Sequence, residues 1–425
     1  MMFLYSIIIL FLGILINIPI GFCLLLASLI YIILLGDIPF SIVVHGMFAG
    51  VDNFVLLSVP FFILMGELMN QGGMTKKLFR FASALVGHLP GGLAYVNVIA
   101  SMIFAGMSGS AVADVGGLGS IEIKAMLEDG YDREFSAGVT AASATIGPII
   151  PPSIPIIIYG VYANVSIIEL FVAGFLPGVL IGIVLMIYIY IISRRRKYPI
   201  HKKADFKELI RSFFDTLPSL LAPGLLVGGI ISGVFTPTEC GAAAAAYALF
   251  LTVIIYKEIK INELPLIFLK VAKVTAFVML LVSAASVFSW LLVRGNITAI
   301  IAQGVLQLST NYFFILALIN ILLLIVGCFI GPIEAIMIFL PVLYPIVTSV
   351  GINLIQFGII MVFNLVIGLL TPPVASVLCL VSNISEIPFG KMCRAIIPFY
   401  IPLLIALLII TYTPISLILP NILFR

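Results

Sequence analysis

The stretch GPIIPPSIP, residues 147–155, carries four prolines in nine positions between the apolar runs AGVTAASATI and IIIYGVYANV. Proline removes a backbone donor and clashes with the preceding helical turn. In hydrocarbon, a carbonyl that loses its partner finds no water to bind. The stretch therefore predicts a helix that is broken at membrane depth, and the break requires a local explanation.

The composition is that of a membrane protein. Of 425 residues, 63% are hydrophobic and 9% are charged, whereas soluble domains carry about 25% charged residues. Apolar runs long enough for a span of ~20 residues recur along the chain, without the alternating pattern of a membrane barrel. We therefore expect an all-α polytopic membrane protein with no nucleic-acid partner. Its first segment should be retained, because no basic region or cleavage site marks a signal peptide.

The positive-inside rule orients the predicted segments. The longest polar stretch, 194–211, is strongly basic and is placed in the cytoplasm. If 92–113 and 312–334 are re-entrant hairpins, 19 of the 21 Lys and Arg residues fall on the cytoplasmic side. The predicted segments are 3–35 with a kink at Pro19, 54–70, 92–113, 135–163, 167–192, 214–232, 236–256, 264–293, 297–309, 312–349, 355–383 and 394–420.

Helix-breaking residues recur at a shift of 221 residues, where chance would give about one or two matches. Five predicted crossings separate the two copies, an odd number, so the second copy is expected to be inverted. Inverted repeats with interrupted helices are typical of secondary transporters. The aligned pairs are Gly106 with Gly327, Gly147 with Gly368, Pro151 with Pro372, Pro152 with Pro373 and Pro177 with Pro398.

The repeat offers an explanation for the broken helix. The paired prolines are expected to free the carbonyls of Gly147 and Pro148 in the first copy, and of Gly368 and Leu369 in the second. Carbonyl oxygens held inside protein are hard ligands, suited to Na⁺. The alternative is a plain proline kink patched by a nearby Ser or Thr. Each break also has a glycine-rich partner 41 residues upstream that fits a hairpin tip.

Four motifs together resemble the large membrane subunit of a tripartite ATP-independent periplasmic (TRAP) transporter. They are GMSGSAVAD at 106–114, IGPIIPPSIPIIIYG at 146–160, SGVFTPTECGA at 232–242 and IGLLTPPV at 367–374. The resemblance implies an elevator-type transporter of the bacterial inner membrane, driven by two or more Na⁺ ions and not by ATP. It also implies four partners: a small membrane subunit, a periplasmic substrate-binding protein, an organic-acid substrate and membrane lipid.

The resemblance further implies a division of the single membrane domain, 1–425. Two transport repeats, each a hairpin plus a broken helix, would move against a scaffold. The repeats are expected at 92–164 and 312–385, and the scaffold at 1–91, 165–311 and 386–425.

Residue roles are carried over from the resemblance by position. One sodium site would use backbone oxygens around Ala105, Gly147, Ile150 and Pro151; the second would use Gly327, Gly368, Thr371 and Val374. The acidic substrate would bind Ser108, Ser153 and the positive end of the helix that begins near Pro152.

The second hairpin tip departs from the family pattern. Sialic-acid members carry an Asp where this chain has Gly331, and Glu334 is the candidate replacement. C4-dicarboxylates and other sugar acids therefore stay open beside sialic acid as substrates.

Other functions fit the sequence less well. The G-x-S-G motif around Ser108 fits an intramembrane serine protease, but the three histidines fall at loops or segment edges. No ATP-binding loop of the form G-x-x-x-x-G-K-[ST] occurs. A passive anion channel remains an alternative. Among the acidic residues, Glu67, Asp114, Glu239 and Glu334 are candidates for intramembrane roles. For Glu239, at the start of a segment, stabilisation of the helix N-terminus is the preferred explanation.

Overall fold

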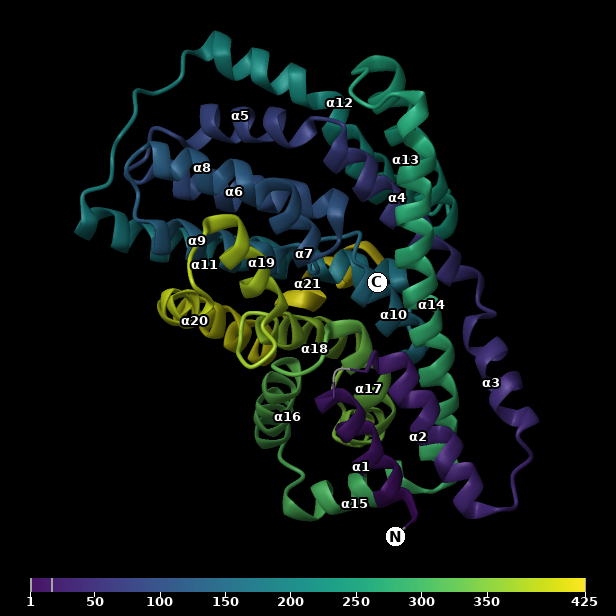
Figure 1. Ribbon diagram of the computed structural model, residues 1–425. Coiled ribbons are helices and arrows are strands. Elements are labelled where there is room, and N and C mark those ends of the chain that lie inside the picture. Colours follow the sequence, from purple (N-terminus) through teal and green to yellow (C-terminus); the bar gives the residue numbers. More distant parts are fainter. Residues whose placement is uncertain (1, 17, 425) are drawn as a thin grey trace.

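The computed structural model describes residues 2–16 and 18–424, and every regular element within them is helical (Figure 1). In this described part, seven helices have the length and apolar character needed to cross a membrane. The class predicted from composition, an all-α polytopic membrane protein, is therefore confirmed. The seven helices are Phe54–Gln71, Ile167–Arg196, Phe206–Ile230, Pro237–Ile255, Ile261–Arg294, Pro332–Ser349 and Phe389–Tyr412.

The predicted break is present. Helix α9 (Arg133–Ser143) ends in a short 3₁₀ turn, residues 147–153 are not helical, and α10 (Ile154–Ala163) begins after them. A second interruption separates α18 (Leu354–Gly368) from α19 (Ser376–Ser385). In both cases the helix stops where consecutive prolines cannot supply backbone donors.

Each broken helix is preceded by a helical hairpin. In the first, α6 (Gly92–Ser108) turns at Gly109, whose φ of +58° suits glycine, and returns through α7 (Ala111–Asp114) and α8 (Ser120–Glu128). In the second, α16 (Tyr312–Gly327) is followed by α17 (Pro332–Ser349).

The predicted hairpin ends, 113 and 334, are wrong, because both return arms continue to 128 and 349. The first predicted hairpin ends at residue 113, just before the acidic residue Asp114. The structure buries Asp114 and Glu122, so the polar residues do not mark a loop. A π-helical turn, residues 115–119, joins the two parts of this arm.

The two hairpin units exchange partners. Helix α10 packs against α17 and α18, which belong to the second unit. Helix α19 packs against α7, α8 and α9, which belong to the first. The second half of each broken helix is thus held by the other unit, and the two breaks lie between the units.

A separate group of helices packs around α14 (Leu264–Arg294), which runs along one side of the molecule in Figure 1. It contacts α2 (Ile20–Leu35), α3 (Ser41–Val51), α4 (Ser58–Gln71) and α17. Helix α13 (Pro237–Phe250) packs against α4 through small residues, with Ala244, Ala245 and Ala248 buried. Such residues let helix backbones approach closely.

Two predicted segments are wrong in kind. The segment 3–35 is not one kinked helix, because α1 (Met2–Leu15) and α2 are separate and pack against each other. Likewise, 394–420 is divided into α20 (Phe389–Tyr412) and α21 (Ile415–Phe424). Hydropathy measures the length of an apolar run, and only packing decides whether a proline within it kinks the helix or ends it.

The remaining helices complete the chain. The amphipathic α5 was not predicted as a segment because its polar face interrupts the apolar run, and α12 packs along it. Helix α11 continues through Pro177. These helices are α5 (Met74–Val86), α11 (Ile167–Arg196), α12 (Phe206–Ile231) and α15 (Ile297–Leu308).

Candidate functional site

Each break lies against the tip of its own hairpin. We define the first site as the tip 106–110 with the break 147–153, and the second site as the tip 327–331 with the break 368–374. Both sites are formed by segments that contain glycine and proline where backbone approaches backbone. The contacts therefore depend on main-chain atoms more than on side chains.

In the first site, tip and break touch directly. A Cβ added to Gly109 would lie 2.5 Å from the carbonyl oxygen of Pro152, and one added to Gly147 would lie 3.3 Å from the carbonyl of Ser110. The carbonyl oxygen of Pro151 lies 3.8 Å from the Cβ position of Gly106. Only glycine permits this approach at Gly109, where the backbone is also left-handed.

The second site repeats this arrangement. A Cβ on Gly368 would run into the backbone of Gly327, and the Val374 N–H donates to the carbonyl of Cys328 at 3.2 Å. The hydroxyl of Thr371 donates to the carbonyl of Ile367 at 3.2 Å. The structure thus brings Gly327, Gly368, Thr371 and Val374 into one region.

Most of the carbonyls that the sequence predicts to lack a hydrogen-bond donor at the breaks do have one. Pro148 O accepts from the Ser153 hydroxyl at 2.5 Å, Gly368 O accepts from Thr371 N–H at 2.8 Å, and Leu369 O accepts from Val377 N–H at 3.3 Å. Only Gly147 O, of the four predicted, accepts no hydrogen bond from the part of the chain that the structure describes. The expectation was wrong for three because the chain folds back on itself at each break. A carbonyl that accepts one hydrogen bond still has a second lone pair.

The other residues predicted for the first sodium site do not all lie at the contact between tip and break. Ala105 O accepts the Gly109 N–H at 3.3 Å within the tip. The side chain of Ile150 packs toward Gly178 of α11, away from the tip. Ser110 was not predicted, although it lies beside Gly147 and caps α7, accepting from Ala113 N–H. Its place next to Gly109 in the hairpin motif was the available signal.

The two candidate substrate serines lie close together but differ in their bonding. Ser153 is the N-cap of α10; its hydroxyl accepts from Ile156 N–H at 3.3 Å while donating to Pro148 O. Ser108 is buried, and its hydroxyl has no hydrogen-bond partner among the described residues. Because Gly109 lies against Pro152 and the Cα of Ser153, the tip places Ser108 beside the start of α10.

This bonding also bears on the protease alternative. A serine nucleophile needs a base within hydrogen-bond reach, and within the described residues Ser108 has none. His201, one of the three histidines, pairs with Asp129 at 2.8 Å on the exposed surface. The arrangement does not form a serine–histidine pair.

At the second tip, the carboxylate of Glu334 lies over Gly331. A Cβ built on Gly331 would clash with an oxygen of the Glu334 carboxylate, whose side chain starts in the first turn of α17. The acid therefore occupies the space in which a side chain at 331 would begin.

A buried polar network that the sequence did not predict joins each hairpin to its broken helix. In the first unit, Asn97 of α6 donates to Thr140 at 2.7 Å and accepts from Ser143 at 2.7 Å, both on α9. In the second, Asn364 of α18 donates to Asn320 of α16 at 2.6 Å. Ser143 and Asn364 are separated by the repeat shift of 221 residues. Because they differ in residue type, matches between identical Gly and Pro residues do not reveal this pair.

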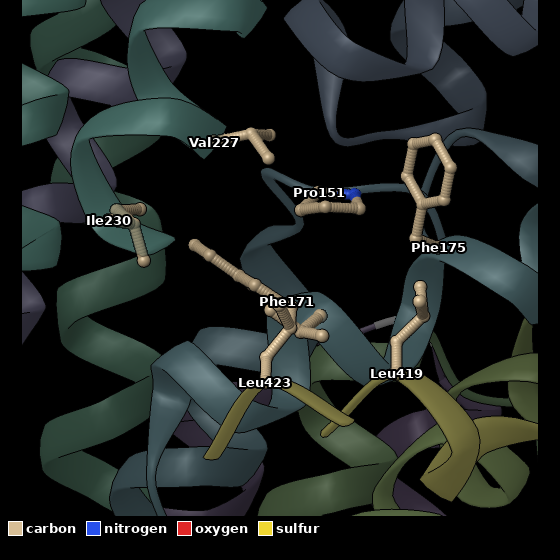
Figure 2. Close-up of a pocket in the computed structure, with 8 residues that line it drawn as sticks. Pro151, Phe171, Phe175, Val227, Ile230, Leu419 and Leu423 are labelled. Carbon is tan, nitrogen blue, oxygen red and sulfur yellow. The ribbon is translucent and has the colours of Figure 1, made fainter. Parts of the chain in front are cut away.

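One apolar pocket lies beside the first site (Figure 2). Its volume is about 230 Å³, and Pro151 and side chains of α11, α12 and α21 line it. None of its lining side chains carries a polar group, so it offers nothing to an organic anion. The polar side chains nearest to the first break, Ser108 and Ser153, do not line this pocket.

Comparison with known proteins agrees with this geometry. Residues 7–415 match the family described as the tripartite ATP-independent periplasmic transporter, DctM component. The chain is 42% identical over 404 residues to the sialic acid TRAP transporter large permease protein SiaM of Vibrio cholerae, covering 95% of each chain. It is 40% identical over 376 residues to the C4-dicarboxylate TRAP transporter large permease protein DctM of Pseudomonas aeruginosa, covering 88% of each.

A further relative is the 2,3-diketo-L-gulonate TRAP transporter large permease protein YiaN of Escherichia coli, 38% identical over 408 residues and covering 96% of each chain. The fold is similar to that of the Alcanivorax borkumensis YdaH transporter, with a TM-score of 0.58, 14% identity and coverage of 88% of this chain and 87% of that chain. The family is one of transporter permeases and not of enzymes. This chain belongs to the DctM large permease family of tripartite ATP-independent periplasmic transporters.

Proposed function

We propose that the chain is the large permease of a sodium-driven TRAP transporter that takes up an organic acid by an elevator movement. The observation that carries this proposal is the pair of hairpin and broken-helix units. Helices α16, α17, α18, α19 and α20 begin 220 to 222 residues after α6, α7, α9, α10 and α11. This register and the exchange of α10 and α19 between units support two inverted repeats around a central site.

The backbone contacts of the two sites support sodium binding. In the first site, the Gly147 carbonyl without a donor is an oxygen that a hard cation can satisfy. Ser110 O approaches the Cβ position of Gly147 and Pro151 O approaches that of Gly106, so both oxygens lie between the tip and the break. In the second site, the Thr371 hydroxyl adds a side-chain oxygen beside Gly368. A bound Na⁺ would supply the positive charge by which the ion gradient and an anionic substrate are coupled.

The polar contact between the first tip and α10 supports anion binding. A buried hydroxyl without a partner, that of Ser108, is costly unless a ligand completes it. It lies beside the N-terminus of α10, whose positive dipole end favours an anion, and where Ser153 caps Ile156 N–H and Pro155 has no N–H. A carboxylate or sulfonate would satisfy both groups.

The second tip supports a substrate range that includes C4-dicarboxylates and other sugar acids beside sialic acid. The sequence resemblance implies an Asp at 331 in sialic-acid members; here the Glu334 carboxylate reaches the space beside Gly331 from another position and on a longer side chain. We propose that Glu334 faces the substrate and selects its hydroxyl groups. Relatives are named for sialic acid, C4-dicarboxylates, 2,3-diketo-L-gulonate and, in Oleidesulfovibrio alaskensis, isethionate. The organic-acid class follows from this set.

The proposed parts of the elevator are the two hairpin and broken-helix units and the rest of the chain. The transport part comprises 92–164 and 312–385, and the scaffold comprises 1–91, 165–311 and 386–425. The group around α14, which includes α2, α3, α4 and α13, supports a scaffold that packs together, with α4 against the first hairpin tip, where a Cβ on Gly66 would lie 3.1 Å from Met107 O. A small membrane subunit would extend this scaffold in the bacterial inner membrane, and a periplasmic binding protein would deliver the acid.

Reconstituted transport tests the proposal. Proteoliposomes would contain the permease and its small subunit, with the binding protein and one radiolabelled acid outside, under an inward Na⁺ or K⁺ gradient. We expect saturable uptake that requires Na⁺ and the binding protein. Uptake that does not saturate and ignores Na⁺ would favour a passive channel. Robust uptake by the permease alone would contradict the tripartite assignment.

A further inference from the structure

The apolar pocket beside Pro151 lies between the first break and three helices that pass behind it. Figure 2 shows the ring of Pro151 facing Phe171 and Phe175 of α11, with Val227 of α12 and Leu419 of α21 around the same space. The pocket is on the side of the break away from the hairpin tip, because the tip meets Pro151 and Pro152 through their carbonyls. It is therefore distinct from the ion and substrate region.

The chemistry of the lining restricts the occupant. Every lining side chain is a hydrocarbon, and the volume is about 230 Å³. Apolar cavities of roughly 150 Å³ stay dry and bind small hydrocarbons such as benzene. Water, ions and organic acids would find no hydrogen-bond partner among these side chains. A hydrocarbon is the class of ligand that fits.

The mouth of the pocket meets the apolar exterior of the molecule. Phe175 is 45% exposed and Leu423 is 47% exposed, although both line the pocket. On α12 and α21, which also line the pocket, Leu225 and Ile422 are further exposed large hydrophobic residues. In a chain that spans the bilayer, this exterior faces lipid tails. Whatever fills the pocket enters from hydrocarbon.

We propose that this pocket binds one acyl chain of a membrane phospholipid, with the tail resting on the ring of Pro151. The lipid would exclude water from the rear of the first break, where the bilayer offers no partner for backbone groups. The site is defined by its lining and its opening, so the proposal holds whether or not the neighbouring carbonyls bind Na⁺. A helix of another subunit is the competing occupant, and the test separates the two.

Photo-crosslinking tests the proposal. The permease, alone and with its small subunit, is placed in nanodiscs of bacterial phospholipids that include a phosphatidylethanolamine with a diazirine near the end of one acyl chain. After irradiation, adducts are mapped by mass spectrometry. We expect at least fivefold more adducts around Phe171–Phe175 and Val227–Ile230 than around Ile401, a lipid-facing residue of α20 that is 61% exposed.

Two substitutions sharpen the test. Val227→Trp and Leu419→Trp each place a bulky side chain in the pocket from a different helix, and each should lower the pocket adducts at least threefold. Ile401→Trp is the matched control and should leave them unchanged. Equal labelling of the pocket and α20 in the unmodified protein would overturn the proposal without any variant. Loss of pocket labelling when the small subunit is present would assign the pocket to that protein and also overturn it.

Discussion

The two breaks share one backbone device but lie in different surroundings. Residues 147–153 are all buried, enclosed by the first hairpin tip, α11 and α12. In the second break, Pro372, Pro373 and Val374 are exposed, and Val374 reaches 51%. The first site is therefore covered by this chain itself, whereas the described residues leave one side of the second site open.

The two breaks also differ in which groups donate hydrogen bonds to their carbonyls. In the first, a hydroxyl from Ser153 satisfies Pro148 O inside the protein. In the second, backbone donors satisfy Gly368 and Leu369, and the side-chain oxygen comes from Thr371. At the repeat shift, Thr371 corresponds to Ile150, which has no hydroxyl. We therefore expect the structure of the first site to be maintained mainly by the surrounding helices. We expect Na⁺ affinity at the second site to depend more on its own polar groups.

The largest loss of stability should come from a substitution at the glycine contact in the second site. Gly368→Ala places a Cβ in the backbone of Gly327, and overpacking of this kind costs about 1–3 kcal/mol. We expect a lower midpoint of thermal unfolding in detergent and loss of Na⁺-dependent stabilisation. Gly147→Ala, whose Cβ would have neighbours at 3.3 Å, should lose less.

Gly224→Ala is the matched control for that experiment. Gly224 lies within α12, and a Cβ there would have no neighbour within 4 Å, so the change should be neutral or stabilising. If Gly224→Ala and Gly368→Ala lower the midpoint equally, the backbone contact is not the cause.

The two serines of the first site should both affect substrate affinity, but only one of them should affect stability. Ser153→Ala removes an N-cap and the bond to Pro148 O, and should lower stability by about 1 kcal/mol. It should also raise the substrate concentration needed for half-maximal uptake. Ser108→Ala removes a hydroxyl without a protein partner, so the unfolding midpoint should hold while substrate affinity falls. Unchanged affinity in both variants would remove these serines from the substrate site.

The hydroxyl of Thr371 should affect Na⁺ more than stability. Thr371→Val keeps the shape but removes the oxygen, and a loss of about 1 kcal/mol corresponds to roughly a fivefold weaker apparent Na⁺ affinity. Stabilisation by increasing Na⁺, with choline replacing it, measures this affinity without a known substrate. Thr348→Val is the control, since its hydroxyl also bonds a carbonyl four residues earlier, at 2.9 Å, away from the site. Equal changes in both would mean that the role is structural.

The smallest effect concerns how the two broken helices begin. Asn353 caps α18 with its own side chain, accepting from Ile355 N–H at 2.8 Å. At the matching position before α9, Asp132 makes no cap and instead accepts hydrogen bonds from Tyr198 at 2.7 Å and Arg196 at 2.5 Å. The Tyr198 hydrogen bond, followed by Arg196, lowers the pKa of the Asp132 carboxyl.

A lowered pKa means that this contribution to stability is present above the pKa of the unfolded chain and is lost as pH falls through the folded value. Asp132→Asn should therefore reduce stability slightly at neutral pH, by roughly 0.5 kcal/mol or less for so exposed a pair. The deficit should vanish in acid. Unfolding midpoints of both proteins between neutral and acid pH measure it, and a deficit that persists in acid would point to a role other than charge.

Much of this protein was predictable because membrane helices obey strong local rules. Apolar runs in the sequence predicted the helical class, and consecutive prolines at 151–152 and 372–373 predicted both interruptions. The glycine-rich tips predicted the contact partners of the breaks, since only glycine allows such close backbone approach. The motif resemblance predicted the family to which the chain belongs.

Several features were decided by contacts between residues far apart in the sequence. Hydropathy could not show that 3–35 folds back as two helices, or that Asp114 and Glu122 are buried within a hairpin arm. It could not show that three of the four expected carbonyls find donors. Each of these depends on which partner comes within hydrogen-bond or packing distance.

The sequence by itself determined where the backbone breaks, because a proline lacks its donor in any surroundings. Only the tertiary structure decided what faces each break: a buried tip and an apolar pocket at the first, an open side at the second. The physical reason is the distance along the chain over which each property is set: a missing N–H is a property of one residue. Burial and hydrogen bonding are properties of the neighbours that folding brings together.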